Sequence, residues 1–116
     1  MAERIYKVLT ESAFREAARS GQFAGSTDDA RDGFIHLSAG PQLEATLAKH
    51  FAGQDGLLLL VVDGARLGPD LKWETSRGGA LFPHLYAPLD LGAVLWVDRL
   101  KLGPDGRHIL PQGAFA

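Results

Sequence analysis

Apolar positions recur with helical spacing in two segments of the first half of the chain. In residues 11–20 apolar side chains return every three to four positions, which predicts an amphipathic helix with Thr10 as its N-cap and Gly21 at its end. In residues 41–52 leucine and phenylalanine stand at intervals of four, after a proline suited to the first helical turn. Two N-terminal helices are therefore predicted.

Shorter apolar or alternating segments predict strands. Residues 57–62 form an unbroken run of Leu and Val, typical of a strand covered on both faces, so we expect the central strand here. Residues 33–38 alternate in polarity, which places His36 and Ser38 on one face and leaves the other face for the core. Turns rich in Gly and Pro separate the remaining strand candidates, which are residues 4–9, 71–74, 85–87, 93–100 and 107–110.

Residues 22–32 combine Gly, Ser, Thr and Asp without a period and are predicted to form a polar loop. The order of elements predicts an α+β domain, with two N-terminal helices and a bent or split, mostly antiparallel sheet. The 116 residues suffice for one hydrophobic core, so residues 1–116 are predicted to form a single domain.

Composition narrows the classes of partner. The chain has 12 Lys and Arg against 14 Asp and Glu and no basic run, which argues against nucleic acid as a main partner. Its apolar runs are too short for a membrane span, and the first residues lack the pattern of a signal peptide, so no membrane role is expected. The absence of Cys excludes disulfides and thiolate metal sites and agrees with a cytoplasmic location.

His36 and Ser38, on the same face of a predicted strand, form the first candidate site. An imidazole beside a hydroxyl can form the polar wall of a pocket that binds a small molecule. The alternative is structural, with His36 as a buried histidine bonded to the backbone and Ser38 leading into the second helix.

The segment from Trp73 to Gly79, with the sequence WETSRGG, is the second candidate. Adjacent glycines such as Gly78 and its neighbour can direct backbone N–H groups toward an anion, and Arg77 can add a bidentate contact. A phosphate or a carboxylate is the ligand that this pattern indicates. The alternative is an exposed loop in which Glu74 and Arg77 form a surface ion pair.

His84 and Tyr86 form the third candidate, because a strand would place them on one face. The imidazole can titrate or donate a hydrogen bond near neutral pH, and the phenol offers a stacking ring with a polar tip. The alternative is an edge strand between prolines with half-buried aromatic rings. The chain has no close pair of histidines and no His-Glu pair at helical spacing, so no metal site is predicted.

Together these segments resemble a known bacterial family. Tyr6 in the first strand, residues 32–38 (DGFIHLS), residues 73–79 (WETSRGG) and residues 82–86 (FPHLY) look like the bacterial domain-of-unknown-function 952 family. The likeness extends over about residues 5–100. It implies a family without an established activity.

The order of elements is also similar to the catalytic half of RNA 2′-phosphotransferases, which belong to the ADP-ribosyltransferase-like superfamily. That resemblance implies an NAD-binding cleft between two small sheets, with His36 on the matching strand and Glu74 in the acidic role against a ribose hydroxyl. Where those enzymes carry His-Gly-Thr in the first strand, this chain has Tyr6-Lys7-Val8.

We therefore predict a small cytoplasmic domain of ADP-ribosyltransferase-like fold that binds a small polar or phosphorylated molecule, with NAD or another nucleotide as the cofactor or substrate. For a transferase, the catalytic residues are predicted to be Glu74, His36 and His84. The predicted ligand-binding residues are Ser38, Trp73, Ser76, Arg77, Gly78 and Tyr86. The alternative is a non-catalytic regulatory module that binds a metabolite or a protein, and in a third interpretation these polar residues are only structural.

Overall fold

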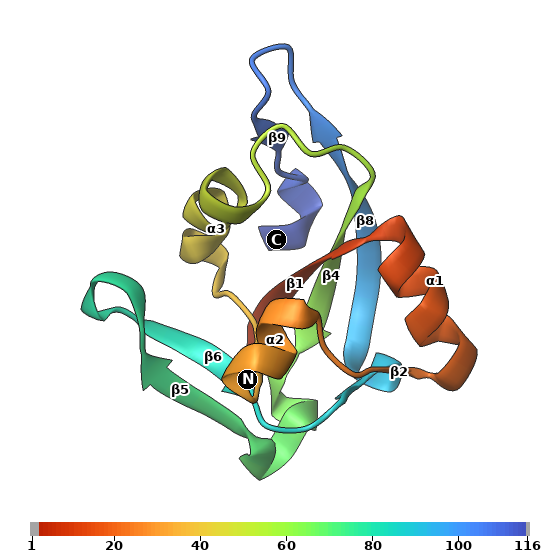
Figure 1. The fold of residues 1–116 in the computed structure, drawn as a ribbon, viewed down its shortest axis with the longest axis vertical. Helices are drawn as coiled ribbons and strands as arrows, with labels where there is room; N and C mark the ends of the chain where they lie inside the picture. The colour runs from red at the N-terminus through yellow and green to blue at the C-terminus, as the bar shows by residue number, and fades with distance from the viewer. Residues whose placement is uncertain (1–2, 116) are drawn as a thin grey trace.

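The structure, a computed structural model, describes residues 3–115, apart from the side chains of Arg77 and of residues 114 and 115. Its longest sheet has the order β1-β4-β8-β9, and every pair of neighbours in it is antiparallel. The predicted central strand is confirmed, because β4 lies between β1 and β8 (Figure 1). The four strands are β1 (Arg4–Thr10), β4 (Leu57–Asp63), β8 (Val94–Leu102) and β9 (His108–Ile109).

Two smaller antiparallel sheets accompany the long one. One has the order β3-β6-β5, and the other pairs β2 with β7. The prediction of an α+β domain with a split, antiparallel sheet is therefore confirmed. These strands are β2 (Gln22–Phe23), β3 (Ile35–His36), β5 (Leu71–Thr75), β6 (Leu81–Leu85) and β7 (Leu89–Asp90).

Helices α1 (Glu11–Ser20) and α3 (Leu43–His50) are the two that the apolar spacing predicted. The side chain of Thr10 accepts the N–H of Ala13 at 3.1 Å, and Gly21 ends α1 in the left-handed conformation at φ 82°. The two helices cover opposite faces of the long sheet (Figure 1), because their buried residues belong to different core clusters.

The polar loop predicted over residues 22–32 is wrong, since this segment forms β2 and a third helix, α2 (Thr27–Asp32). The helix begins at a capping box, in which Ser26 accepts the N–H of Asp29 while the Asp29 carboxylate accepts the N–H of Ser26. Its six residues are too few and too polar to show a helical period. The described part of the N-terminal half therefore contains three α-helices instead of two.

The strand predicted over residues 85–87 lies earlier, at β6, with Pro83 in its middle. The backbone of Pro83 faces β3, where its carbonyl accepts the N–H of Leu37 at 3.1 Å. The N–H and C=O of one residue point to the same side of an antiparallel strand. The N–H that Pro83 lacks would therefore point away from β5, toward the chain just after β3, so its absence costs no hydrogen bond between β5 and β6. The β5–β6 ladder is therefore intact.

The core consists of two clusters separated by the long sheet. One contains Leu60 and Val62 of β4 with residues of α1, β3 and β6, and the other contains Leu59 and Val61 of β4 with residues of α3. Alternate β4 side chains enter opposite clusters, as the period of a strand requires. Among the described residues, no helix has the length and apolar character needed to cross a bilayer.

Candidate functional site

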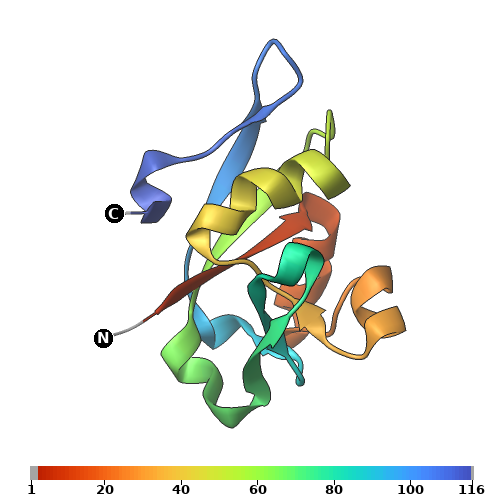
Figure 2. The ribbon, with the colours of Figure 1, turned by 90° about the vertical axis from the view of Figure 1, so that its left-hand side faces the viewer.

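A cavity of about 290 Å³ opens where the long sheet meets the β3-β6-β5 sheet. The two sheets are joined beside it by a backbone bridge, in which Tyr6 and Ser38 each donate an N–H to the other's carbonyl at 2.8 and 2.9 Å. Helices α2 and α3 and the β5–β6 hairpin surround the same region (Figure 2). The polar lining residues are Tyr6, Lys7, Ser26, Asp28, Asp29, Arg31, Asp32, His36, Ser38, Thr46, His50, Ser76 and His84.

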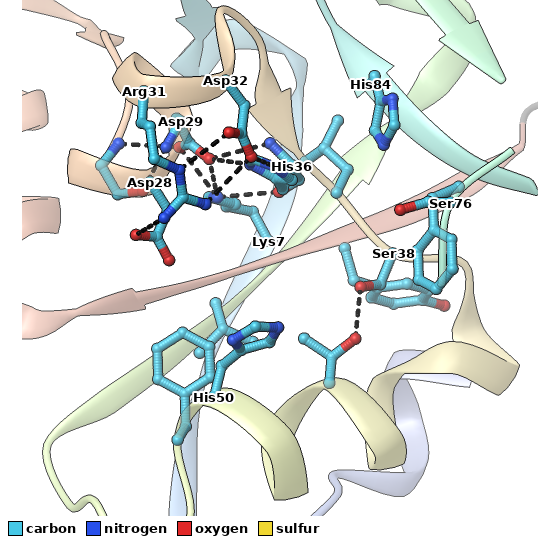
Figure 3. A pocket seen from close by; sticks show the side chains of 17 residues that line it. Lys7, Asp28, Asp29, Arg31, Asp32, His36, Ser38, His50, Ser76 and His84 are labelled. Carbon is cyan, nitrogen blue, oxygen red and sulfur yellow. Dashed lines mark hydrogen bonds and ion pairs between the residues drawn. The ribbon is translucent and has the colours of Figure 1, made fainter. Parts of the chain in front are cut away.

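The three candidate segments converge in the β3-β6-β5 sheet. His36 and His84 are directly opposed in the β3–β6 ladder, and Glu74 lies opposite Phe82 in the β5–β6 ladder. The two imidazole rings both border the cavity, with their centroids 5.8 Å apart (Figure 3). Two histidines separated by nearly 50 residues thus form one wall.

His84 is buried, with 5% of its surface exposed, and is held on two sides. Phe34 stacks on its ring at a centroid distance of 4.0 Å, and its Nδ1 donates to Glu74 Oε1 at 2.8 Å. The same carboxylate oxygen accepts the hydroxyl of Tyr86 at 2.6 Å. The hydrogen bonds from Tyr86 and His84 lower the pKa of Glu74, so its carboxylate is the stable form. Glu74 and Tyr86 support His84 and do not line the cavity themselves.

His36 is held between two carboxylates. Its Nδ1 donates to Asp29 Oδ1 at 2.7 Å, and its Nε2 lies 2.8 Å from Asp32 Oδ2. Because a carboxylate only accepts hydrogen bonds, the doubly protonated ring satisfies both contacts. The structural alternative, a histidine whose ring bonds to the backbone, is not what the structure shows.

Lys7 and Asp29 form a buried ion pair that the sequence pattern did not reveal. Lys7 Nζ donates to Asp29 Oδ2 at 3.1 Å and to the carbonyl of His36 at 2.8 Å, and both side chains are more than nine-tenths buried. Burial lowers the pKa of Lys7, although the Asp29 charge opposes that shift. Burial alone would raise the pKa of Asp29, but Lys7 and the hydrogen bonds from Ser26 and His36 bring it down to about 2.

The charges around the cavity balance one another. On α2, Arg31 Nε lies 2.9 Å from Asp32 Oδ1, and its Nη1 lies 3.4 Å from Asp28 Oδ1. Lys7 and Arg31, together with the His36 ring between Asp29 and Asp32, therefore face the three carboxylates Asp28, Asp29 and Asp32 (Figure 3). The cavity is polar but close to neutral, which favours hydroxyl and amide groups over a bare phosphate.

The other predicted site residues are divided between the cavity and the sheet behind it. Ser38 lines the cavity, where its Oγ lies 3.2 Å from Thr46 Oγ1, and Ser76 lines the rim. Trp73 packs against the core cluster of α1. Of the predicted residues, Gly78 lies in the β5–β6 turn, and the side chain of Arg77 lies outside the described part of the chain.

The glycine pair lies in the turn between β5 and β6, and its contact with an anion stays a prediction. Gly78 and Gly79 adopt φ values of 65° and 81°, and Gly79 donates its N–H to the carbonyl of Ser76 at 3.0 Å. Ser76 in turn donates its N–H to the carbonyl of Ala80 at 2.9 Å. These bonds close the turn, so the role of the pair is to reverse the chain between β5 and β6.

Sequence reasoning missed Lys7, Asp29 and Asp32. One signal was present, because Ser26 followed three residues later by Asp29 is the pattern of a capping box. Nothing local indicated Lys7, whose partner is 22 residues away. A search of the described residues finds no group of three or more His, Cys, Asp or Glu side chains arranged to hold a metal ion.

Comparison with known proteins places the chain beside uncharacterised relatives. A family model described as "Protein of unknown function (DUF952)" matches residues 8–97. The crystal structure of protein CC0527 from Caulobacter crescentus is 49% identical, with a TM-score of 0.93 over 97% of this chain and 99% of that one. The solution NMR structure of CC0527 is 52% identical, with a TM-score of 0.81 over 90% of each chain. No curated protein matches the chain significantly.

Proposed function

The chain belongs to the DUF952 family of proteins of unknown function, and from its own geometry we propose that it binds a nucleotide, with the nucleoside part in the cavity between its two sheets. The observation that carries this proposal is the convergence of the His84 imidazole with the hydroxyls of Ser38 and Ser76 on one cavity, beside the charged cluster around His36. Imidazole and hydroxyl groups bind ribose hydroxyls and base amides through directional hydrogen bonds.

The size and charge of the cavity support the nucleoside part as its occupant. A volume of about 290 Å³ lies near the lower end of ligand-binding pockets, so a part of a dinucleotide fits while the rest stays outside. Because the paired charges leave the interior close to neutral, the phosphates are better placed at the rim. The β5–β6 turn that carries Ser76 and Arg77 is the proposed position for them.

NAD is the first nucleotide to test. The order of strands and helices resembles that of RNA 2′-phosphotransferases, which implies an NAD-binding cleft of the ADP-ribosyltransferase-like kind between two small sheets. The cavity of this chain also lies between two sheets, which supports the proposal without depending on any one catalytic residue.

Calorimetric titration with NAD, ADP-ribose and a 2′-phosphorylated nucleotide tests the proposal. At least one of them is expected to bind saturably to the wild type. Ser76→Phe, which places a ring at the cavity rim, should weaken that binding by about tenfold or more. Ser12→Phe, on an exposed position of α1, is the matched control and should bind as the wild type does. The absence of binding by all three, or equal binding by both variants, contradicts the proposal.

The same samples distinguish an enzyme from a regulatory module. Release of nicotinamide from NAD, measured by chromatography after incubation with the protein, indicates a transferase or hydrolase. Saturable binding without release indicates a module that senses the nucleotide, which is the alternative from the sequence.

A further inference from the structure

The two histidines of the cavity differ in what their ring nitrogens contact. Both nitrogens of His36 face carboxylates, so neither is available to a ligand. His84 is bonded only through Nδ1, and within the described part of the chain no group lies in hydrogen-bond contact with its Nε2. The ring points into the cavity, toward the same space as Ser76 (Figure 3).

The free nitrogen of His84 is reachable and able to accept a proton. Among the described residues, every fully buried side-chain nitrogen or oxygen has a hydrogen-bond partner. Nε2 of His84 has no such partner, so it is not fully buried and is in contact with solvent. Glu74 only accepts hydrogen bonds as a carboxylate, which places the proton of the neutral ring on Nδ1. The lone pair of the neutral imidazole is then on Nε2, at the cavity surface.

We infer that His84 is the general base of the cavity and that Glu74 is its positioning residue, oriented in turn by the Tyr86 hydroxyl. This inference deepens the proposed function and, in its chemical part, rests on it. It differs from the expectation that Glu74 contacts a ribose hydroxyl, because Glu74 lies behind the ring of His84.

In the step that follows, a hydroxyl group of water or of an acceptor alcohol gives its proton to Nε2 of His84. Its oxygen forms a bond to the ribose C1′ of NAD, while the bond from C1′ to the nicotinamide nitrogen breaks. The electron pair of that bond stays with nicotinamide, which leaves as a neutral molecule. His84 afterwards releases the proton to solvent, so no other reactant is needed.

Charged and titratable groups face the His84 ring from both neighbouring strands. Lys72 is its cross-strand neighbour on β5, but Lys72 Nζ lies over the Tyr86 ring, 5.3 Å from the centroid. His36 faces it from β3, and Glu74 is the carboxylate in contact with it. A carboxylate at Nδ1 favours the proton on that nitrogen in both protonation states of the ring.

Nitrogen NMR of the full-length, ¹⁵N-labelled chain tests the inference without any activity. Over a pH titration, neutral His84 is expected to carry its proton on Nδ1, with Nε2 showing the shift of an unprotonated nitrogen. Glu74→Ala removes the acceptor and should move the proton to Nε2, whereas Glu16→Ala, on an exposed position of α1, should leave the His84 signals unchanged. Tyr86→Phe, which keeps the ring, should alter the Glu74 contact without reversing the tautomer.

A neutral His84 with its proton on Nε2, or a tautomer that Glu74→Ala leaves unchanged, overturns the inference. Where nicotinamide is released, Glu74→Gln should lower kcat at least about tenfold with little change in KM, and Glu16→Ala should change neither. Equal loss in both variants also overturns it. The NMR result does not depend on the calorimetric titration with nucleotides. If no nucleotide binds, the proposed function fails, but the tautomer of His84 is still measured.

Discussion

The carboxylate of Asp29 holds three parts of the chain together. It accepts from Lys7 in β1, from the N–H of Ser26 before α2, and from both the ring and the N–H of His36 in β3. A buried ion pair stabilises a protein only when its remaining hydrogen bonds are made, and Asp29 satisfies this condition. The wall of the cavity therefore depends on Asp29, a residue that the sequence analysis did not select.

Asp29→Asn is predicted to lower the free energy of unfolding by roughly 3–5 kcal/mol, because it leaves the buried Lys7 charge without its counter-ion. Urea denaturation followed by circular dichroism measures the change. Asp28→Asn is the control on the same helix, where the carboxylate is exposed and the change should stay within about 0.5 kcal/mol. Similar losses in both variants would show that the ion pair does not stabilise the fold.

Asp29 also predicts how stability depends on pH. Its pKa is lowered from 3.8 to about 2 in the folded chain, so the unfolded chain binds its proton first as the pH falls. The contribution, about 2 kcal/mol, should be fully present above about pH 5 and disappear as the pH falls toward 2. Urea denaturation over the range from roughly pH 2 to 6, where carboxyl groups titrate, measures this contribution. A slope that persists unchanged in Asp29→Asn would assign the effect to other carboxylates.

At the scale of elements, α2 is the segment whose stability decides whether the cavity wall is formed. It is short, and its N-terminus is satisfied by the capping box of Ser26 and Asp29. Ser26→Ala is predicted to cost α2 about 1 kcal/mol, and so to raise hydrogen exchange of its amides about fivefold, with Ala30 and Gly33 as reporters. Thr27→Ala, one residue later and exposed, is the control. An unchanged exchange rate in Ser26→Ala would mean that Asp29 alone holds the helix.

How far the elements could be predicted depends on how local their signals are. Helix α1 was predictable because its cap, its apolar period and its terminating glycine all lie within 12 residues of sequence. Helix α2 was not, since a polar segment of six residues has no period. Strand β6 was predicted at the wrong position because proline usually ends a strand. Only the arrangement of the neighbouring strands shows that the backbone of Pro83 points away from β5.

Prediction of the candidate site from the sequence is limited in the same way. His36 and His84 could be singled out, since both are polar residues flanked by apolar ones in strand-like segments. The carboxylates that orient them could not be assigned in advance, because Glu74 reaches His84 only when β5 and β6 are paired, and Asp29 reaches His36 only when α2 packs beside β3. That His84 keeps a free ring nitrogen while His36 has none follows from those contacts.

At the scale of the whole molecule, β4 contributes side chains to both core clusters, so we expect the two clusters to unfold as one cooperative unit. Leu59→Ala and Leu60→Ala leave cavities in different clusters, and each is predicted to lower the free energy of unfolding by roughly 2–5 kcal/mol. Circular dichroism and tryptophan fluorescence should give the same midpoint in both variants, since Trp73 packs on one cluster and Trp96 on the other. Leu95→Ala, at an exposed position of β8, should change stability by less than about 0.5 kcal/mol. Separate midpoints for the two probes would mean that the clusters unfold independently.

The contact that joins the long sheet to the β3-β6-β5 sheet is a bridge between main-chain atoms. Tyr6 and Ser38 exchange N–H and C=O groups there, and every amino acid except proline supplies both. Lining side chains outside the ion pair of Lys7 and Asp29, such as Ser76, can therefore be replaced while the joined sheets persist, so related chains are free to diverge in what they recognise. The same feature makes the cavity a scaffold for directed evolution, in which a library of altered linings keeps a common architecture.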